Sequence, residues 1–494
     1  MNTDVKSILD GTPHGLLLKR IGDVADRVGV EAYAVGGLVR DLLLGRPKNQ
    51  IDDIDFVTVG AGTGIDLARA VAADFGVKPV SIYPKFGTAA VRIPPEGAFL
   101  DGLLLEFVAS RRESYRADSR KPIVEDGSLE DDQRRRDFTI NAMAIHLNKK
   151  AFGTLIDPFD GRADLDRRLI RTPLEPEETF DDDPLRMVRA ARFAAQLSFE
   201  IDPQAVDAMA RRADRITIVS QERVTDEFEK IMCAIRPSVG FKILESVGIL
   251  ARILPEIVDL KGVETVDGQK HKDNFYHTLE VLDNLVEMTP RQTCDETYWL
   301  RWAALLHDIG KPSTKRFSRG SGWTFHGHEE RGARMIGRLF RRLRLPTDDR
   351  MQYVRKMIRL HHRPVSLVDE HVTDSAVRRL LFDAGDDIDD LMVLVRADIT
   401  SKNPRRVRRY LSAFDEVDRK MLEVEEKDRL RNFQPPVDGN EIMQVLGVPP
   451  SRVVGDLKEA IKDAILDGEI PNEHDAAFEY LMEIKDEILA RRSS

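Results

Sequence analysis

A change of pattern near Pro184 most constrains what this chain can fold into. On its N-terminal side, short apolar runs alternate with segments of helical periodicity. Strands are expected at residues 33–35, 56–59, 89–93 and 103–109, and helices at residues 16–28, 38–44 and 65–75. On its C-terminal side, apolar residues recur at helical spacing and no further strand is expected. The sequence therefore predicts an α+β protein, with a small mixed-sheet head followed by an all-helical body.

The 494 residues are enough for several domains, since a domain usually holds about 100–200 residues. Breaks in the helical pattern indicate seams at residues 261–271 and 432–439. We therefore expect four regions, namely a head (1–150), a helical neck (151–260), a helical body (261–430) and a helical tail (431–494).

Charge and hydropathy limit the environment of the chain. No apolar run approaches the roughly 18 residues that cross a bilayer, and the N-terminus has no basic head followed by an apolar stretch. We expect a cytoplasmic protein without a membrane partner. The net charge of −10 does not indicate nucleic-acid binding, but basic residues cluster at 134–136 and 404–409. The oligomeric state stays open, with a homodimer as one alternative.

Two glycines and three carboxylates carry the densest chemistry of the head. Gly36 and Gly37 separate an expected strand from a helix, where backbone N–H groups can approach a phosphate, although many structural turns look the same. Asp53 and Asp55 alternate on a strand and therefore share a face. Glu106 lies in another apolar strand, where a charge is costly unless it is paired or binds metal. These carboxylates predict a Mg²⁺ site, with a solvated acidic turn as the alternative.

The motifs GGLVRD, DIDFV, LEFVASRRESY and RRRDFTINAMA follow one another in the N-terminal half. In this order they resemble the class II family of tRNA nucleotidyltransferases and bacterial poly(A) polymerases. The resemblance implies a polymerase β-type nucleotidyltransferase head, ATP and CTP as substrates, and tRNA as the partner. It also implies catalytic and metal-binding roles for Asp53 and Asp55, with Glu106 completing the site. The nucleotide-binding residues that it implies in the head are Gly36, Gly37, Arg40, Asp41, Arg135, Arg136 and Asp137.

The segment DDDPLRMVRAARF resembles the motif with which this family selects the base. Asp183 and Arg186 occupy the selecting positions, while Asp182 replaces the usual Glu and is expected to cap the following helix. A carboxylate and a guanidinium fit the exocyclic amine and ring nitrogen that cytosine and adenine both offer. Arg189 and Arg192 are also expected near the nucleotide, with a solvated stripe as the alternative. Glu222 and Arg223, in the motif QERVTDEFEKIM, are expected to be structural.

Eight of the 11 histidines lie between His271 and His371. Their order resembles the HD superfamily of helical, metal-dependent phosphohydrolases. The resemblance implies a minimal metal site of His277, His307, Asp308 and Asp398. His328, and either His361 or His362, match the additional ligands of two-metal members. Imidazole with carboxylate suits Mn²⁺, Ni²⁺, Co²⁺ or Fe²⁺ without deciding among them.

Together these features predict template-independent addition of CMP and AMP to the 3′ end of tRNA. The stretch at 113–132 resembles a flexible segment that the family needs to change from adding C to adding A, which favours full CCA synthesis. The HD region predicts a hydrolase for 2′,3′-cyclic or terminal phosphates, and the tail is expected to bind tRNA. Alternatives are an A-adding or poly(A)-adding enzyme, an HD hydrolase whose head only binds RNA, and a small-molecule nucleotidyltransferase.

Overall fold

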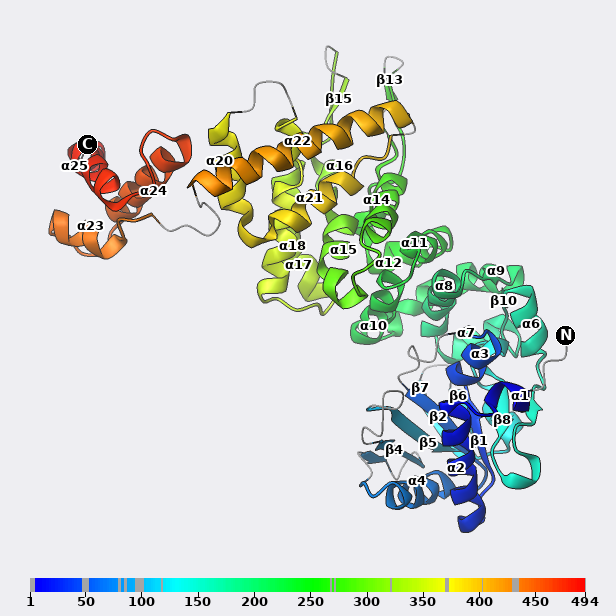
Figure 1. The fold of residues 1–494 in the computed structure, drawn as a ribbon. Coiled ribbons are helices and arrows are strands. Elements are labelled where there is room, and N and C mark those ends of the chain that lie inside the picture. The colour runs from blue at the N-terminus through cyan, green and yellow to red at the C-terminus, as the bar shows by residue number, and fades with distance from the viewer. Residues whose placement is uncertain are drawn as a thin grey trace. The chain divides into compact units, whose positions relative to one another are not determined.

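The computed structural model of the chain describes most of its length (Figure 1). The described residues are 5–46, 53–78, 81–83, 87–93, 102–116, 119–266, 269–270, 272–319, 322–368, 373–401, 403–428 and 435–493. They form two compact units, one of residues 1–234 with 239–253 and one of residues 235–238 with 254–494. No helix among these residues is long and apolar enough to cross a membrane.

The first unit contains a seven-stranded mixed sheet in the order β3-β4-β5-β2-β1-β8-β9. Its strands are β1 (Ala32–Val35), β2 (Asp53–Thr58), β3 (Ser81–Tyr83), β4 (Thr88–Arg92), β5 (Leu104–Ala109), β8 (Ala144–His146) and β9 (Leu155–Ile156). Only β2 and β5 run parallel, and the other neighbours are antiparallel. The α+β class expected from the sequence is confirmed.

Helices α2 (Pro13–Val28) and α4 (Thr63–Asp74) pack on each other and on the sheet. The Thr12 side chain accepts a hydrogen bond from the Gly15 N–H, and Pro13 occupies the first turn of α2. In the sheet, Phe56 of β2 stacks on Phe107 of β5 at 4.8 Å between ring centroids, and both are fully buried. Because side chains alternate along a strand, the residues that flank Phe56 in β2 and Phe107 in β5 face the opposite side of the sheet.

The segment that resembles the family's flexible stretch contains a β-hairpin. Strand β6 (Arg111–Arg116) pairs antiparallel with β7 (Ser119–Asp126), from Arg111 opposite Asp126 to Arg116 opposite Ser119. The register shifts between Ser114 and Arg116. Antiparallel pairing satisfies the backbone groups of both strands, which explains why this polar stretch is ordered as a sheet.

Further helices of the first unit lie before, between and after the strands of the sheet. They are α1 (Val5–Leu9), α3 (Gly37–Leu43), α5 (Leu129–Arg134), α6 (Gly161–Arg167), α7 (Pro176–Asp182), α8 (Leu185–Leu197), α9 (Pro203–Arg212), α10 (Gln221–Met232) and α12 (Leu250–Ile253), while α11 (Pro237–Ser246) crosses the division. A short parallel pair, β10 (Leu169–Ile170) and β11 (Glu200–Ile201), lies among them. Strand β11 already shows that the expectation of no strand after Pro184 is wrong.

The second unit is mostly helical. Its helices are α13 (Pro255–Val258), α14 (Asn274–Met288), α15 (Cys294–Leu306), α16 (Lys311–Thr314), α17 (His328–Arg342), α18 (Asp349–Leu360), α19 (Arg363–Ser366), α20 (Asp374–Ala384), α21 (Ile388–Ala397), α22 (Pro404–Asp428), α23 (Gly439–Leu446), α24 (Arg452–Asp467) and α25 (His474–Ser493). Two small hairpins, β12 (Thr265–Val266) with β13 (Gln269–Lys270) and β14 (Arg316–Ser318) with β15 (Gly322–Thr324), were missed by the sequence pattern. Strands of two or three residues are too short to establish an alternating pattern.

Candidate functional site

Three carboxylates gather on one face of the head sheet. Asp53 and Asp55 are alternate residues of β2, and the parallel pairing with β5 places Glu106 directly opposite Asp55. Residues opposite each other in a sheet project to the same side. The structure therefore brings together the three carboxylates that the sequence proposed as a metal site.

The electrostatics of this face fit a divalent cation. Burial raises the pKa of Asp55, and the neighbouring Asp53 carboxylate raises it further against the opposing effect of Arg136. Burial also raises the pKa of Glu106, and the charges of Asp55 and Asp53 add to that increase. Like charges held together disfavour ionisation, and a hard cation with oxygen ligands such as Mg²⁺ relieves the repulsion.

The glycine turn lies against this carboxylate face. Gly36 has φ +74°, a backbone conformation that side chains with a Cβ rarely adopt. A Cβ at this position would lie 3.0 Å from Asp55 Oδ2 and 3.3 Å from Arg136 Nη1. The next residue, Gly37, begins α3, and a Cβ there would meet only Arg40 at 3.5 Å. Gly36 therefore keeps the backbone close to the carboxylates.

Arg40 and Asp41 brace the turn through contacts within the head. The Arg40 guanidinium donates to both oxygens of Asp41, at 3.0 and 2.8 Å, and to Asn141 Oδ1 at 2.8 Å. Arg40 is 8% exposed. Arg40 therefore helps to fix the shape of the glycine turn. This is compatible with the nucleotide-binding role expected from the sequence.

The arginine block contains a buried carboxylate that the sequence analysis missed. Arg135 and Arg136 both donate to Asp132, which is fully buried. Burial alone would raise the pKa of Asp132, but the two guanidinium groups hold it below its usual value. A buried charge is tolerated when it is paired in this way. Asp132 therefore positions both arginines. Its spacing of three and four residues from them, typical of ion pairs at the end of a helix, is the sequence signal that could have identified it.

Asp137, at the end of the same block, joins the head to α8. It accepts two hydrogen bonds from Arg189, at 2.8 and 2.5 Å, and one from Asn141 at 3.0 Å. Burial opposes its ionisation, yet the charge of Arg189 and these hydrogen bonds keep the pKa of Asp137 well below its usual range. Arg189, whose side chain is 33% exposed, is thus held in an ion pair at the cavity and is not simply part of a solvated stripe.

Arg192 is also buried, at 7% exposure, and pairs with Glu227 of α10 at 3.2 Å. Burial, together with the nearby charge of Arg189, lowers the pKa of Arg192 to about 10. Its guanidinium lies 4.1 Å from the ring centroid of Phe193. The solvated-stripe alternative does not describe this residue either, and its contacts are those of a group that holds α8 against α10.

The expected base-selecting residues lie where α7 meets α8. The Asp183 carboxylate accepts from the Leu185 N–H at 3.1 Å and from Arg223 at 2.6 Å. Asp182, which was expected to cap the next helix, is instead the last residue of α7. Pro184 directly precedes α8, and the first N–H of that helix is satisfied by Asp183. Arg186 donates to the Arg135 carbonyl oxygen at 2.6 Å. Arg223, which was expected to be structural, contacts Asp183 and therefore lies at the edge of the candidate site.

These groups meet in a cavity of about 290 Å³ within the first unit. Its lining contains the metal-site carboxylate Asp55, the arginine block and the proposed base-selecting pair. The lining residues are Asp55, Phe56, Val57, Val108, Arg135, Arg136, Asp137, Asp183, Arg186, Arg189 and Arg223. One cavity thus offers acidic groups for a cation, guanidinium groups for phosphates, and an acid–base pair for a heterocycle.

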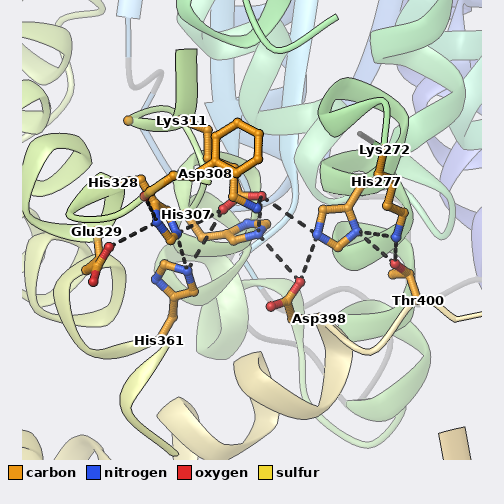
Figure 2. A network of polar contacts seen from close by, with 12 residues as sticks. Lys272, His277, His307, Asp308, Lys311, His328, Glu329, His361, Asp398 and Thr400 are labelled. Carbon is orange, nitrogen blue, oxygen red and sulfur yellow. Dashed lines mark hydrogen bonds and ion pairs between the residues drawn. The ribbon is translucent and has the colours of Figure 1, made fainter. Parts of the chain in front are cut away.

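A second centre lies in the other unit, around the buried Asp308 (Figure 2). Asp308 Oδ2 is 3.2 Å from His307 Nε2 and 3.7 Å from His277 Nε2, and Asp398 Oδ1 is 2.9 Å from His277 Nε2. On its other side, Asp308 Oδ1 is 3.5 Å from His328 Nε2 and 3.9 Å from His361 Nε2. Two potential metal-binding groups therefore share Asp308, one with His277 and His307 and one with His328 and His361.

Hydrogen bonds behind the rings orient the histidines. The Nδ1 atoms of His307, His328 and His361 lie 2.7–2.8 Å from backbone carbonyl oxygens three residues earlier in the chain. His277 Nδ1 lies 2.8 Å from Thr400 Oγ1. For the first three histidines, a donor at Nδ1 leaves Nε2 as the lone-pair atom. The Nδ1 of His277 also lies 3.0 Å from Lys272 Nζ, and the Nε2 atoms of all four histidines face Asp308 (Figure 2).

Close backbone packing brings Asp308 to His328. A Cβ on Gly310 would lie 2.0 Å from the carbonyl oxygen of His328, so only glycine permits this approach. Of the two alternatives left open by the sequence, His361 is buried beside His328, whereas His362 is exposed and its ring centroid lies 5.9 Å from that of His328. The structure therefore brings His361, and not His362, into the cluster.

The chemistry of this cluster fits transition-metal ions. His307 Nε2 and Asp308 Oδ1 are buried without a hydrogen bond to any described residue. Burial and the neighbouring His307 lower the pKa of His361 to about 3, which keeps the imidazole neutral as a metal ligand requires. Lys311, which the sequence analysis did not single out, donates to Asp308 Oδ2 at 2.6 Å. Lys311 therefore lies next to the candidate metal ligands, at a position where its ammonium group could bind a phosphate.

Comparisons with known proteins agree with both centres. Residues 32–171 match the poly A polymerase head domain, residues 198–260 the probable RNA and SrmB-binding site of polymerase A, and residues 274–402 the HD domain. A multifunctional CCA protein of Ralstonia nicotianae is 34% identical over 81% of this chain and 84% of that protein. The chain belongs to the class II family of tRNA nucleotidyltransferases and poly(A) polymerases.

Other members of the family show how widely the similarity extends. An A-adding tRNA nucleotidyltransferase of Deinococcus radiodurans is 33% identical over 71% of this chain and 78% of its own length. The Bacillus stearothermophilus CCA-adding enzyme, solved in complex with CTP, is 25% identical, with a TM-score of 0.60 over 97% of this chain and 100% of that chain. The Thermotoga maritima CCA-adding enzyme, at 22% identity and a TM-score of 0.59 over 99% of this chain and 98% of that chain, shares the fold.

Proposed function

We propose that the first unit of this nucleotidyltransferase adds CMP and AMP from CTP and ATP to the 3′ end of tRNA, with release of pyrophosphate. The observation that carries the proposal is the single cavity lined by Asp55, Asp183 and Arg186. A nucleotide in that cavity can place its triphosphate toward the carboxylate face and its base toward α8. The names of the relatives, which include CCA proteins, support the same reaction.

The carboxylate face provides the means for phosphoryl transfer. Asp53, Asp55 and Glu106 would hold Mg²⁺, which when bound supplies charge neutralisation for an attacking hydroxyl and a leaving pyrophosphate. The 3′ hydroxyl oxygen of the RNA attacks the α-phosphate and the bond from that phosphorus to the β-phosphate oxygen breaks. Arg135 and Arg136, fixed by Asp132, face the cavity that would contain the triphosphate.

The pair Asp183 and Arg186 can select the base. An ionised carboxylate only accepts hydrogen bonds and has several lone pairs, so Asp183 can cap α8, bind Arg223 and still accept from an exocyclic amine. Arg186 can donate to an unprotonated ring nitrogen. Cytosine and adenine offer this combination, whereas uracil and guanine offer a carbonyl beside a ring N–H and would leave the pair unsatisfied.

Incubation of the full-length protein with tRNA truncated at each terminal position, with each nucleotide alone and with all four, tests this proposal. We expect CMP addition to tRNA that lacks CCA and AMP addition to tRNA that ends in CC, with little use of UTP or GTP. A second candidate, addition of A alone, is favoured by the A-adding relative from D. radiodurans. AMP addition without any CMP addition would establish that candidate and reject CCA synthesis.

For the second unit we propose a phosphohydrolase that removes 2′,3′-cyclic or terminal phosphates from RNA ends. His277, His307, Asp308, His328, His361 and Asp398 would hold Mn²⁺, Ni²⁺, Co²⁺ or Fe²⁺, which when bound supplies an activated water for attack on phosphorus. Hydrolysis of a cyclic phosphate consumes one water and breaks one of the two ester bonds. An assay with each metal separately tests this activity, and no turnover with any of them would reject it.

A further inference from the structure

An arginine-rich segment follows the second centre along the chain. Asp398 comes directly after α21, Thr400 contacts His277, and α22 begins at Pro404. The first turns of α22 carry Arg405, Arg406, Arg408 and Arg409, which we name the α22 arginine cluster. Arg405 is five residues from Thr400, so an extended chain limits their separation to roughly 17 Å. The cluster is thus tied to the rim of the HD centre.

The α22 arginine cluster is exposed and has no carboxylate partner among the described residues. The later part of the same helix behaves differently, because Asp415 and Asp418 both accept from Arg396 of α21, at 2.8 and 2.7 Å. The positive charge at the start of α22 is therefore available to an external anion. The whole chain has a net charge of −10, yet none of the described acidic side chains pairs with these four arginines, so their positive charge stays uncompensated.

The position of the cluster is also unfavourable for the helix itself. The first turn of α22 contains no acidic residue, although the positive end of the helix dipole favours acidic groups there and disfavours arginine. The Arg406 and Arg409 guanidinium groups lie 5.7 and 5.5 Å from the Tyr410 ring centroid, so two of the four side chains have an aromatic platform beside them. Arginines at the start of α22 oppose the stability of the helix, and the Tyr410 ring supports two of them. Together these features indicate a binding role for the cluster.

We propose that the α22 arginine cluster binds the phosphate backbone of an RNA strand whose 3′-terminal phosphate occupies the HD centre. Guanidinium groups pair with phosphate oxygens, and four of them, two beside an aromatic ring, suit a single-stranded end. The proposal rests on the proposed hydrolase function, and it deepens that function by naming the residues that would hold the RNA strand next to its terminal phosphate. A mononucleotide offers the cluster no further phosphate of a strand to bind.

The test compares two substrates on the full-length protein. Arg405→Gln combined with Arg409→Gln should raise KM for an RNA that ends in a 2′,3′-cyclic phosphate by about tenfold, and leave hydrolysis of 2′,3′-cyclic AMP unchanged. The salt dependence of RNA turnover should become shallower by about 0.7 in logarithmic slope for each phosphate that the variant no longer neutralises. The matched control, Arg338→Gln with Arg341→Gln, removes two exposed arginines of α17 and should change neither substrate.

Three outcomes would overturn the proposal. RNA turnover that is unaffected by the cluster variant shows that the cluster does not bind the strand, and equal decreases on both substrates indicate damage to the centre. A matching decrease in nucleotide addition by the head would make the cluster a general tRNA-binding site. If the unaltered protein hydrolyses neither substrate, the proposed hydrolase function is rejected. Fluorescence anisotropy with the same RNA then tests the cluster by itself, and an unchanged affinity in the variant rejects the cluster as an RNA site as well.

Discussion

Asp55 is a residue whose burial suits the function and costs stability. Its carboxylate lies on a face shared with Asp53 and Glu106, and against the backbone of Gly36. A carboxyl group with a raised pKa stabilises the fold at low pH, and this contribution is lost as the pH rises through the raised pKa. Without a cation, the head should therefore be less stable at neutral pH than at mildly acidic pH.

Asp55→Asn should abolish nucleotide addition and yet raise the melting temperature in EDTA at pH 7.5. We expect a loss of at least about 1,000-fold in kcat, because an amide is a poor ligand for Mg²⁺. Removal of about 1 kcal/mol of charge repulsion corresponds to a rise of roughly 2–4 °C in a domain of this size. Incorporation assays and thermal denaturation at pH 5 and pH 7.5 measure both effects, and the gain should be larger at pH 7.5.

Asp66→Asn is the matched control, since Asp66 is an exposed acid on α4 of the same unit. It should leave addition unchanged and should not raise the melting temperature, because Asp66 lies in the first turn of α4, where an acidic group stabilises the helix. Full addition by Asp55→Asn would contradict the assignment of the carboxylate face, and a lower melting temperature would contradict the electrostatic argument.

Asp183→Ala should reduce discrimination among the four nucleotides. We expect kcat/KM for CTP and ATP to fall about 100-fold, because the side chain no longer accepts from the exocyclic amine, while UTP and GTP change little. Single-nucleotide incorporation kinetics measure the ratio. In the control Asp181→Ala, the removed carboxylate pairs with Arg212 and Arg215 and does not line the cavity, so selectivity should persist. Retained selectivity in Asp183→Ala would argue against base selection by this pair.

At the scale of elements, the β6–β7 hairpin differs from the other strands of the head, because it is not part of the seven-stranded sheet. It pairs with itself, not with the seven-stranded sheet. Its strands follow directly from β5, which carries Glu106. An element attached at one edge of the site can move without disrupting the core, which suits a change between addition of C and addition of A.

Replacing residues 113–124 with a two-residue Asn-Gly turn should stop synthesis after CC. The remaining strand ends can still close as a short hairpin. We expect AMP addition to fall at least about tenfold while CMP addition changes less than about threefold, as for the loss of a conformational step. Gel analysis of products on tRNA that lacks CCA measures both. Shortening the β14–β15 hairpin of the other unit is the control, and parallel losses of C and A would contradict the idea.

At the scale of the whole molecule, the chain contains two candidate metal-binding centres, one in each of two compact units. None of the residues that line the nucleotide cavity belongs to the histidine cluster. The two activities should therefore respond independently to substitution and to the choice of metal. Such independence would allow the hydrolase to prepare damaged RNA ends without altering nucleotide addition.

Asp308→Asn should eliminate phosphate hydrolysis and metal binding in the second unit, because Asp308 is shared by both potential ligand groups. Addition of CMP and AMP should stay within about twofold of the unaltered protein. Asp53→Ala is the reciprocal variant, in which addition is lost and hydrolysis remains. Metal content by mass spectrometry and both activity assays measure the outcome, and joint loss in either variant would show that the centres are coupled.

The sequence alone determined much of the head, because local rules sufficed there. Alternation on β2 placed Asp53 and Asp55 on one face, and the expected strands and helices near the glycine turn agree with β1, β2, α3 and α4 within a few residues. The motif order led to the family, and the histidine spacing led to the HD region. These inferences depend on residues that are neighbours along the chain or on whole motifs.

Only the tertiary structure decided which distant groups meet. The register of β5 against β2 sets Glu106 opposite Asp55, and burial separates His361 from the adjacent His362. The pairing of Arg223 with Asp183 also joins parts of the chain that no periodicity relates. The physical reason is that strand register, burial and charge pairing arise from packing between elements, whereas a sequence pattern describes one element at a time.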